Sequence, residues 1–172
     1  MAKVVRYHKS NPSPFLVQSL PVIKESITSR LQNKSPVMAD LGAGNGRNLV
    51  CMMDHLPSLT CMAYDLRSDH TMVQQLDLSK GRWPINNDSV DLILCQYLLM
   101  FMDTDGIKHT LSEINRIASK HCVLVLELFS AKQSHFPNNN LLTRLDDKVE
   151  AHLLDSGWDL LHRKQFHILA SK

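Results

Sequence analysis

Paired cysteines and closely spaced histidine pairs are missing from this sequence of 172 residues. The nine histidines include no HxH or HxxxH pair, so their spacing gives no sign of a metal site. The cysteines stand singly in apolar surroundings, without a CxxC pair or the spacing of a disulfide framework. They are Cys51, Cys61, Cys95 and Cys122. We therefore expect reduced core thiols in a cytoplasmic protein without a metal.

Long apolar segments and an excess of one charge are also missing. The longest apolar run, residues 90–102, is interrupted by Asp91 and Gln96, and no apolar segment of signal-peptide length follows the basic N-terminus. The formal net charge is +2 with 21% charged residues, so charge alone predicts no partner. The sequence predicts no membrane segment and has no strong nucleic-acid signature.

Apolar residues make up 44% of the chain, which is enough for one hydrophobic core. A chain of this length is too short for two ordinary domains, so we expect a single domain. The pattern divides it into an N-terminal arm with a lead-in helix, residues 1–35, and a ligand-binding region, residues 36–172.

Strand-like and helical segments alternate along the chain. We expect helices at residues 17–31, 46–55, 103–119 and 141–155. We expect strands at residues 37–41, 59–65, 72–78, 90–96 and 122–128. The tail contains two further strand-like runs that meet at Arg163 and Lys164. This order predicts an α/β fold, with a doubly wound, mostly parallel seven-stranded sheet, helices on both faces and a C-terminal antiparallel hairpin.

The most specific segment is VMADLGAGNGRNL, residues 37–49. Asp40 lies near the end of the first expected strand, and glycines then follow at every second position: Gly42, Gly44 and Gly46. Glycine permits a sharp turn and lets a ligand approach the backbone, and ligands bind at such loops in doubly wound sheets. A dinucleotide fingerprint would need glycine in place of Arg47, and a P-loop would need a lysine followed by Ser or Thr. The loop is therefore not typical of phosphate binding.

An acid two residues before GxGxG resembles the first motif of the class I, Rossmann-like S-adenosylmethionine-dependent methyltransferases. The resemblance implies S-adenosyl-L-methionine as the cofactor, whose amino group and sulfonium suit a nearby carboxylate. It implies cofactor contacts at the loop and the start of the next helix: Asp40, Gly42, Ala43, Gly44, Gly46 and Asn48. Arg47 and Asn48 either assist the cofactor's carboxylate at the helix N-terminus or only begin the helix.

Two further acids stand at expected strand ends, Asp65 after the second strand and Asp77 after the third. In the family, a carboxylate at the first position accepts hydrogen bonds from the ribose hydroxyls, and the residue at the second position meets the adenine amino group. The resemblance therefore implies cofactor contacts at Asp65, Leu66, Asp77 and Leu78, with the Leu78 backbone N–H directed at the adenine ring. Each acid is alternatively an ordinary solvated carboxylate.

Two longer segments extend the resemblance over residues 37–128. WPINNDSVDLILCQYLLMFM is similar to the family's run into the fourth strand, where we expect Asp91 to be structural. LSEINRIASKHCVLVLEL is similar to the following helix and fifth strand. In it, Ser119, Lys120 and His121 replace a common Pro-Gly-Gly turn, which affects the turn more than the chemistry.

Methyl transfer from a sulfonium needs mainly the alignment of the nucleophile with the methyl group. The resemblance implies that residues after the fourth strand face the methyl group, which makes Gln96 and Tyr97 candidates for the catalytic site and Gln96 also a cofactor contact. Tyr97 either bonds the substrate or packs under the next helix. His135 is the best candidate for a general base, if one is used. The basic, aromatic residues 3–9 either contact the substrate or form a solvated terminus.

The predicted function is transfer of a methyl group from S-adenosyl-L-methionine, by in-line displacement, to a small-molecule or macromolecular nucleophile. A nicotinamide-dependent oxidoreductase is disfavoured, because the third glycine is missing and Phe101 stands where a Tyr-x-x-x-Lys pair with Tyr97 would need lysine. The alternative is a non-catalytic cofactor-binding subunit that stabilises or activates a partner protein. The sequence does not identify the methyl acceptor.

Overall fold

The computed structural model describes residues 11–30, 35–68, 70–128, 148–164 and 167–172. Its strands are β1 (Val37–Leu41), β2 (Thr60–Asp65), β3 (Gln74–Gln75), β4 (Val90–Gln96), β5 (Ala118–Glu127), β6 (Asp159–Lys164) and β7 (His167–Ser171). Its helices are α1 (Pro14–Arg30), α2 (Arg47–His55), the 3₁₀ helix η1 (Leu99–Phe101) and α3 (Thr104–Ile117). Residues 148–155 are also helical.

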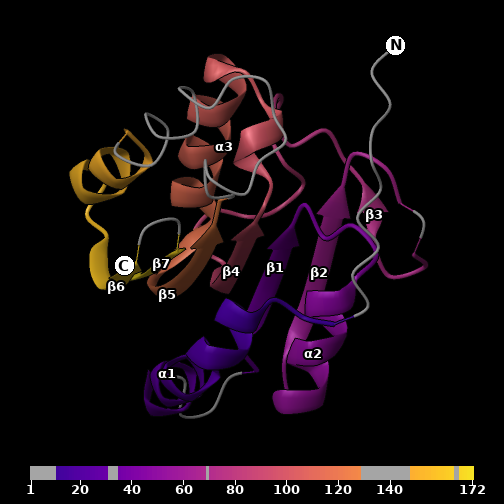
Figure 1. The fold of residues 1–172 in the computed structure, drawn as a ribbon, viewed down its shortest axis with the longest axis vertical. Helices are drawn as coiled ribbons and strands as arrows, with labels where there is room; N and C mark the ends of the chain where they lie inside the picture. Colours follow the sequence, from indigo (N-terminus) through magenta and orange to yellow (C-terminus); the bar gives the residue numbers. More distant parts are fainter. Residues whose placement is uncertain (1–10, 31–34, 69, 129–147, 165–166) are drawn as a thin grey trace.

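The strands form one sheet in the order β3-β2-β1-β4-β5-β7-β6 (Figure 1). Parallel pairs join β3, β2, β1, β4 and β5. The last strand, β7, is antiparallel to both of its neighbours, β5 and β6. The predicted sheet, mostly parallel and ending in an antiparallel hairpin, is confirmed.

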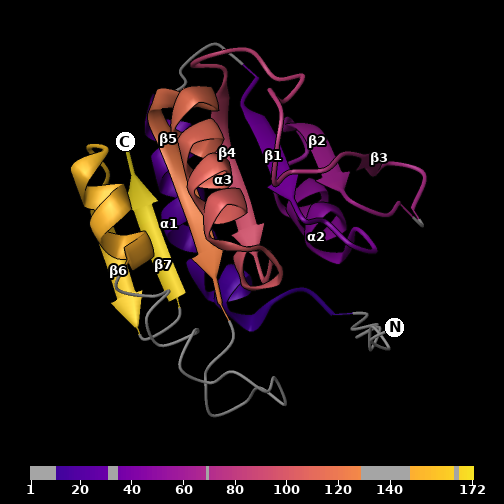
Figure 2. The ribbon, with the colours of Figure 1, turned by 90° about the horizontal axis from the view of Figure 1, so that it is seen from above.

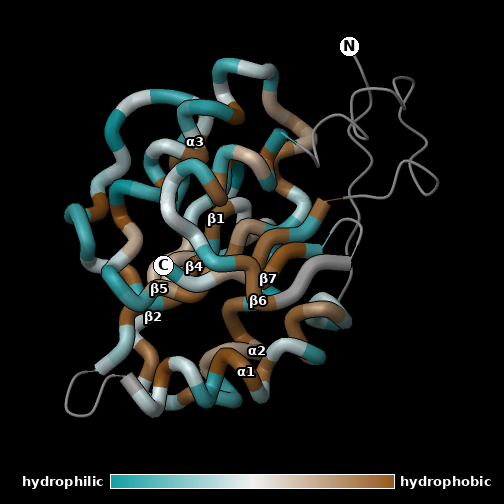
Figure 3. The backbone as a smooth tube through the Cα atoms, turned by 90° about the vertical axis from the view of Figure 1, so that its left-hand side faces the viewer, coloured by the Kyte–Doolittle hydropathy of each residue, from teal (hydrophilic) through white to brown (hydrophobic). Residues whose placement is uncertain are grey.

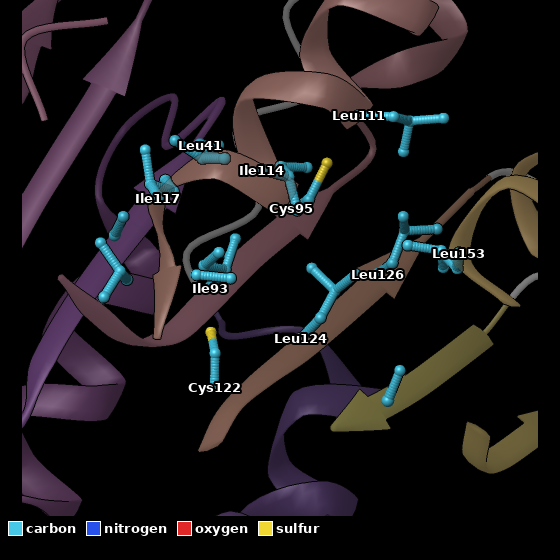
Figure 4. Packing of buried hydrophobic residues seen from close by; sticks show 14 of the residues in the cluster. Leu41, Ile93, Cys95, Leu111, Ile114, Ile117, Cys122, Leu124, Leu126 and Leu153 are labelled. Atoms are coloured by element: carbon cyan, nitrogen blue, oxygen red, sulfur yellow. The ribbon is translucent and has the colours of Figure 1, made fainter. Parts of the chain in front are cut away.

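Helices cover both faces of the sheet (Figure 2). On β4, Leu92 and Leu94 pack with α1 and α2, whereas Ile93 and Cys95 pack in the cluster that includes α3. This alternation follows from the period of two along a strand. Figure 4 shows the α3 side, where side chains from β4 and β5 meet those of the helix. Backbone stretches of hydrophobic residues gather in the sheet, and hydrophilic stretches form outer loops (Figure 3).

Asp91 joins the amino ends of three strands. Its Oδ2 accepts a hydrogen bond from the Val37 N–H at 3.0 Å, and its Oδ1 accepts one from the Ser119 hydroxyl at 2.9 Å. The carboxylate thus links β4 to β1 and β5 at the edge away from the glycine loop. This arrangement agrees with the structural role expected for Asp91.

Several element boundaries differ from the prediction, among them the start of β5, which is Ala118 rather than residue 122. Helix α1 begins at Pro14 rather than at residue 17, because Ser13 caps it: its Oγ accepts from the Leu16 N–H at 3.3 Å. Strand β3 is limited to two exposed residues, because the preceding backbone N–H of Val73 is used in a turn to His70 O. Helix α3 ends at Ile117, since Ala118 already pairs with Val90.

The late helix is described only over residues 148–155, so the expected residues 141–147 lie outside the described chain. Strand β6 includes Arg163 and Lys164, so these two residues, where the hairpin turn was expected, are part of a strand. None of the helices in the described ranges has the length and apolar composition needed to cross a membrane.

All four cysteines are free thiols, as expected, and Cys61 is the only one that is not buried. Burial, with a smaller effect of the Asp40 charge, raises the pKa of Cys95 to about 12. A thiol held protonated in this way is a poor nucleophile at neutral pH. These side chains therefore contribute to packing rather than to chemistry.

Replacing Asp91 with alanine leaves the part-buried Val37 N–H without its acceptor. We expect Asp91→Ala to lower the free energy of unfolding by about 1–3 kcal/mol, the cost of an unsatisfied buried group. Urea denaturation measures this loss. Ligand affinity at the glycine loop should stay unchanged, because Asp91 lies at the other end of the strands. Wild-type stability in the variant would contradict the structural role.

Candidate functional site

The candidate site is the sheet edge where the parallel strands β1, β2 and β4 end. The loop after β1 begins as an extension of its pairing with β2, because Gly42 N and Ala43 N both donate to Tyr64 O, at 2.8 and 3.0 Å. Gly46 N then donates to Ala43 O at 2.9 Å, and α2 starts at the next residue. These bonds fix the path of the loop.

The three loop glycines all have positive φ: +76° at Gly42, +57° at Gly44 and +75° at Gly46. Side-chain-bearing residues rarely adopt this region. At Gly42 a Cβ would also lie 3.0 Å from Leu98 Cδ1, so the loop and the segment after β4 are in close contact. At Gly44 a Cβ would meet no atom within 4 Å. The space beside Gly44 is therefore open to a ligand.

Asp40 is the buried acid of the site. Its side chain is 2% exposed, and its Oδ2 has no hydrogen-bond partner among the described residues. Burial, followed by repulsion from the Asp65 carboxylate, raises the pKa of Asp40 to about 7, although Arg47 and the Leu49 N–H act in the opposite direction. An unpaired buried carboxylate oxygen is costly. A ligand with an ammonium group would supply the missing donor, so the residues present fit such a cofactor.

Asp65 holds the glycine loop from the end of β2. Its Oδ2 accepts from the Gly44 N–H at 2.9 Å, and its Oδ1 accepts from the Arg67 N–H at 3.1 Å. Each carboxylate oxygen has a second lone pair for another donor. Leu66, the next residue, is exposed. A contact of Asp65 with a ribose diol is compatible with this geometry and stays a prediction.

Asp77 is already engaged with its own turn. Its Oδ1 accepts from the Ser79 N–H at 3.1 Å and from the Ser79 hydroxyl at 2.6 Å, and its Oδ2 pairs with Lys80 Nζ at 2.8 Å. The bond to Lys80, with those from Ser79, lowers the pKa of Asp77 to about 2. Leu78 is buried, and its carbonyl accepts from the Thr110 hydroxyl. These bonds support a turn-forming role for Asp77, and its contact with adenine stays a prediction.

Asn48 and Gln96 are buried and bonded to one another. Asn48 Nδ2 donates to Gln96 Oε1 at 2.8 Å. Asn48 Oδ1 accepts from the Ser13 N–H at 2.9 Å, and Gln96 Nε2 donates to Glu127 Oε2. The structure therefore brings together two residues predicted to contact the cofactor, and joins them to two that were not predicted.

Tyr97 follows β4 with a φ of +59°, which is uncommon for a bulky residue. Its hydroxyl donates to Glu127 Oε1 at 2.8 Å. Burial, followed by the Glu127 charge and bond, raises the pKa of Tyr97 above its ordinary value. Tyr97 is therefore a neutral phenol that donates a hydrogen bond and does not act as a base near pH 7.

Sequence reasoning missed two residues of this edge, Ser13 and Glu127. Glu127 is 1% exposed and ends β5. Its signal in the sequence is a single acid closing the apolar run VLVLE. Ser13 lies in NPSPF, which was read as an extended arm although its Ser-Pro pair is typical of a helix start. Its hydroxyl donates to Glu127 Oε2.

Two predicted features lie outside the described residues: His135 and the basic arm, residues 3–9. Arg47 lies inside them, and its Nη1 donates to the Asn11 carbonyl at 2.9 Å. Within the described ranges, no group of three or more His, Cys, Asp or Glu side chains is arranged to hold a metal ion.

The model of a family described as "hypothetical methyltransferase" matches residues 6–157. The chain belongs to this methyltransferase family. No curated protein sequence matches the chain. The family match extends beyond the segment on which the resemblance was based, and it confirms the predicted methyltransferase family.

Solved methyltransferase structures share the fold of this family member. A SAM-dependent methyltransferase from Aquifex aeolicus matches with a TM-score of 0.61 and 14% identity, over 87% of this chain and 88% of that one. A Methanococcus maripaludis structure matches with a TM-score of 0.60 and 14% identity, over 99% of this chain and 97% of that one. A Haloferax volcanii methyltransferase, in complex with the Trm112 methyltransferase activator, matches with a TM-score of 0.59 and 16% identity, over 89% of this chain and 80% of that one. At these identities the structures show the fold alone.

The open space beside Gly44 gives a test with a matched control. Gly44→Ala and Gly81→Ala both place a Cβ at positive φ, with no atom within 4 Å, so both should cost about 1 kcal/mol of stability. Only Gly44 lies at the candidate site. We expect Gly44→Ala alone to abolish binding of S-adenosylhomocysteine, measured by calorimetry. Equal binding by the two variants would contradict a ligand beside Gly44.

Proposed function

We propose that this methyltransferase binds S-adenosyl-L-methionine at the glycine loop and transfers its methyl group to a nucleophile. The observation that carries the proposal is the unpaired Oδ2 of buried Asp40, beside a loop whose glycines leave open space. The cofactor supplies a methyl group activated by the sulfonium and leaves as a thioether. The family assignment supports methyl transfer as the class of reaction.

The described residues suggest how the cofactor would be held. Asp40 offers a carboxylate oxygen to the amino group, and the free lone pairs of Asp65 suit the ribose hydroxyls. The backbone N–H of Leu78 remains the proposed contact for adenine. Asp77 contributes by closing the turn at Ser79 and Lys80, and this turn places Leu78.

Residues after β4 would align the methyl acceptor rather than take its proton. Gln96 does not titrate, and the raised pKa of Tyr97 keeps its phenol protonated. Good alignment of a nucleophile with a reactive group is worth about 7–11 kcal/mol of the barrier. His135 remains the proposed base for acceptors that must lose a proton. The acceptor itself is a small molecule or a macromolecule.

Calorimetric titration with S-adenosylmethionine, S-adenosylhomocysteine and NAD tests the cofactor. We expect dissociation constants on the order of 1 μM to 1 mM for the first two, as for enzyme substrates, and no binding of NAD. The loop lacks the dinucleotide fingerprint, and Asp40 repels phosphates. Binding of NAD alone would overturn the proposal.

The alternative function is a non-catalytic cofactor-binding subunit for a partner protein, and one observation bears on such a partner. One neighbour in fold is a methyltransferase in complex with a methyltransferase activator. To distinguish the two functions, the protein is incubated with methyl-labelled cofactor and, separately, with a protein, an RNA or a small-molecule fraction, and transfer of the label is measured. Label in one fraction identifies the acceptor class, whereas cofactor binding without transfer favours the subunit.

The free thiols support a cytoplasmic location, which stays a prediction.

Binding of the cofactor should release protons near pH 7. Burial raises the pKa of Asp40 to about 7 without a ligand, so its protonated form is populated at that pH. An ammonium group beside it favours the carboxylate, which lowers the pKa and expels the proton. Affinity should therefore fall as the pH drops below 7, by up to about tenfold per unit.

Calorimetry in two buffers of different ionisation enthalpy measures this proton release. In Asp40→Asn the release should disappear and the affinity should become independent of pH between 6 and 8. A wild-type protein that binds without proton exchange at pH 7 would contradict the placement of the amino group.

A further inference from the structure

Four elements of the fold converge on one buried carboxylate, that of Glu127. Oε2 accepts from the Ser13 hydroxyl and from Gln96 Nε2. Oε1 accepts from the Tyr97 hydroxyl at 2.8 Å and lies 3.3 Å from His167 Nε2. The donors come from the start of α1, the end of β4 and β7, whereas Glu127 ends β5. These contacts fill both oxygens of the carboxylate.

Tyr97 is held at both ends by this one residue. Its backbone N–H donates to the Glu127 carbonyl at 2.8 Å, and its hydroxyl donates to the Glu127 carboxylate. A φ of +59° is unfavourable for a residue with a side chain and persists only where its surroundings impose it. Glu127 supplies that constraint at the position where the chain leaves β4.

Stability alone does not account for a carboxylate at this place. A buried charge is costly, and apolar residues of similar volume often give equal or greater stability. The other buried glutamate, Glu113, pairs with Arg116 at 2.7 Å and accepts from the Trp83 N–H at 2.8 Å, so its charge is neutralised within the fold. Glu127 receives mainly neutral donors, all at the edge that carries the candidate site.

We propose that Glu127 is a positioning residue of the cofactor site, which fixes Gln96 and Tyr97 at the end of β4. Through Gln96 it also fixes Asn48, at the start of the helix that follows the glycine loop. Leu98, the next residue after Tyr97, packs against Gly42, so the position of Tyr97 is transmitted to the loop. The inference rests on the proposed function, because it assigns Glu127 a role in the same site.

The same carboxylate ties the start of α1 to the site. The Ser13 hydroxyl donates to Glu127, and the Ser13 N–H donates to Asn48 Oδ1. The Phe15 ring stacks on the His167 imidazole, with centroids 4.6 Å apart. Docking of the segment before α1 and the geometry of the cofactor site therefore depend on one group.

Glu127→Gln tests the inference, with Glu113→Gln as the matched control. The Glu127 variant keeps the side-chain volume but turns an amide N–H toward donors. We expect both variants to lower Tm. At a temperature where circular dichroism shows both folded, only Glu127→Gln should weaken S-adenosylhomocysteine binding, by about tenfold. Calorimetry gives the dissociation constants. No acceptor is needed for this measurement.

Two milder variants keep the test valid should Glu127→Gln fail to fold. Ser13→Ala and Tyr97→Phe each remove one hydroxyl donor and leave the carboxylate in place, so each should weaken binding by about threefold to tenfold, as expected for one hydrogen bond. In a foldable Glu127→Gln background, Tyr97→Phe should add less than it does in the wild type, because the shared bond is already lost.

The outcomes separate this inference from the proposed function. A wild-type protein that does not bind S-adenosylhomocysteine overturns both. If the wild type binds and Glu127→Gln binds with the same affinity, the positioning role is overturned and the proposed function stands. The same conclusion follows if Glu113→Gln loses as much affinity as Glu127→Gln. Unchanged affinity in both Ser13→Ala and Tyr97→Phe likewise overturns the positioning role.

Discussion

Parallel pairing is the constraint on which the site depends. Because β2, β1, β4 and β5 run in one direction, their carboxyl ends lie at one edge, and the chain must leave each strand there. Apolar side chains fill both faces of the sheet, so the polar residues at these ends find partners in each other and in the segments that lie beside the strand ends, including the glycine loop. The bonds of Asp65 to Gly44 and of Gln96 to Asn48 follow from this crowding.

The buried acids divide by the completeness of their bonding. Asp91 and Glu113 have partners on both carboxylate oxygens, away from the loop. Asp40 has an oxygen without a partner, and burial, followed by the Asp65 charge, raises its pKa and favours its neutral form. Glu127 has a full set of donors, yet they come from segments distant in the chain. A carboxylate oxygen without a hydrogen-bond partner, as in Asp40, is suited to binding a ligand. A fully bonded carboxylate that joins distant segments, as in Glu127, is suited to positioning other side chains.

The sequence predicted the elements whose signal is local. The bounds of β1 and β4 were correct because each is an apolar run with a clear polar end. The bonds of Asp77 to Ser79 and Lys80 are equally local, so the alternative of an ordinary carboxylate was visible in advance. Glu127 was missed because its partners lie on α1, β4 and β7, and only the folded sheet brings them together. The start of α1 was missed because Ser13 was read as part of an arm.

The contact between Gly42 and Leu98 also bears on how the protein folds. The loop after β1 makes this contact only when the segment beyond β4 is in place, and the register that joins β1 to β4 pairs Met38 with Leu92, far apart in the chain. Such long-range parallel pairing is slow to form, because its closure entropy must be overcome first. If the loop is completed only after the rate-limiting step, a ligand that binds it has no site in the transition state for folding. Such a ligand would stabilise the native protein by slowing unfolding and would leave the folding rate unchanged.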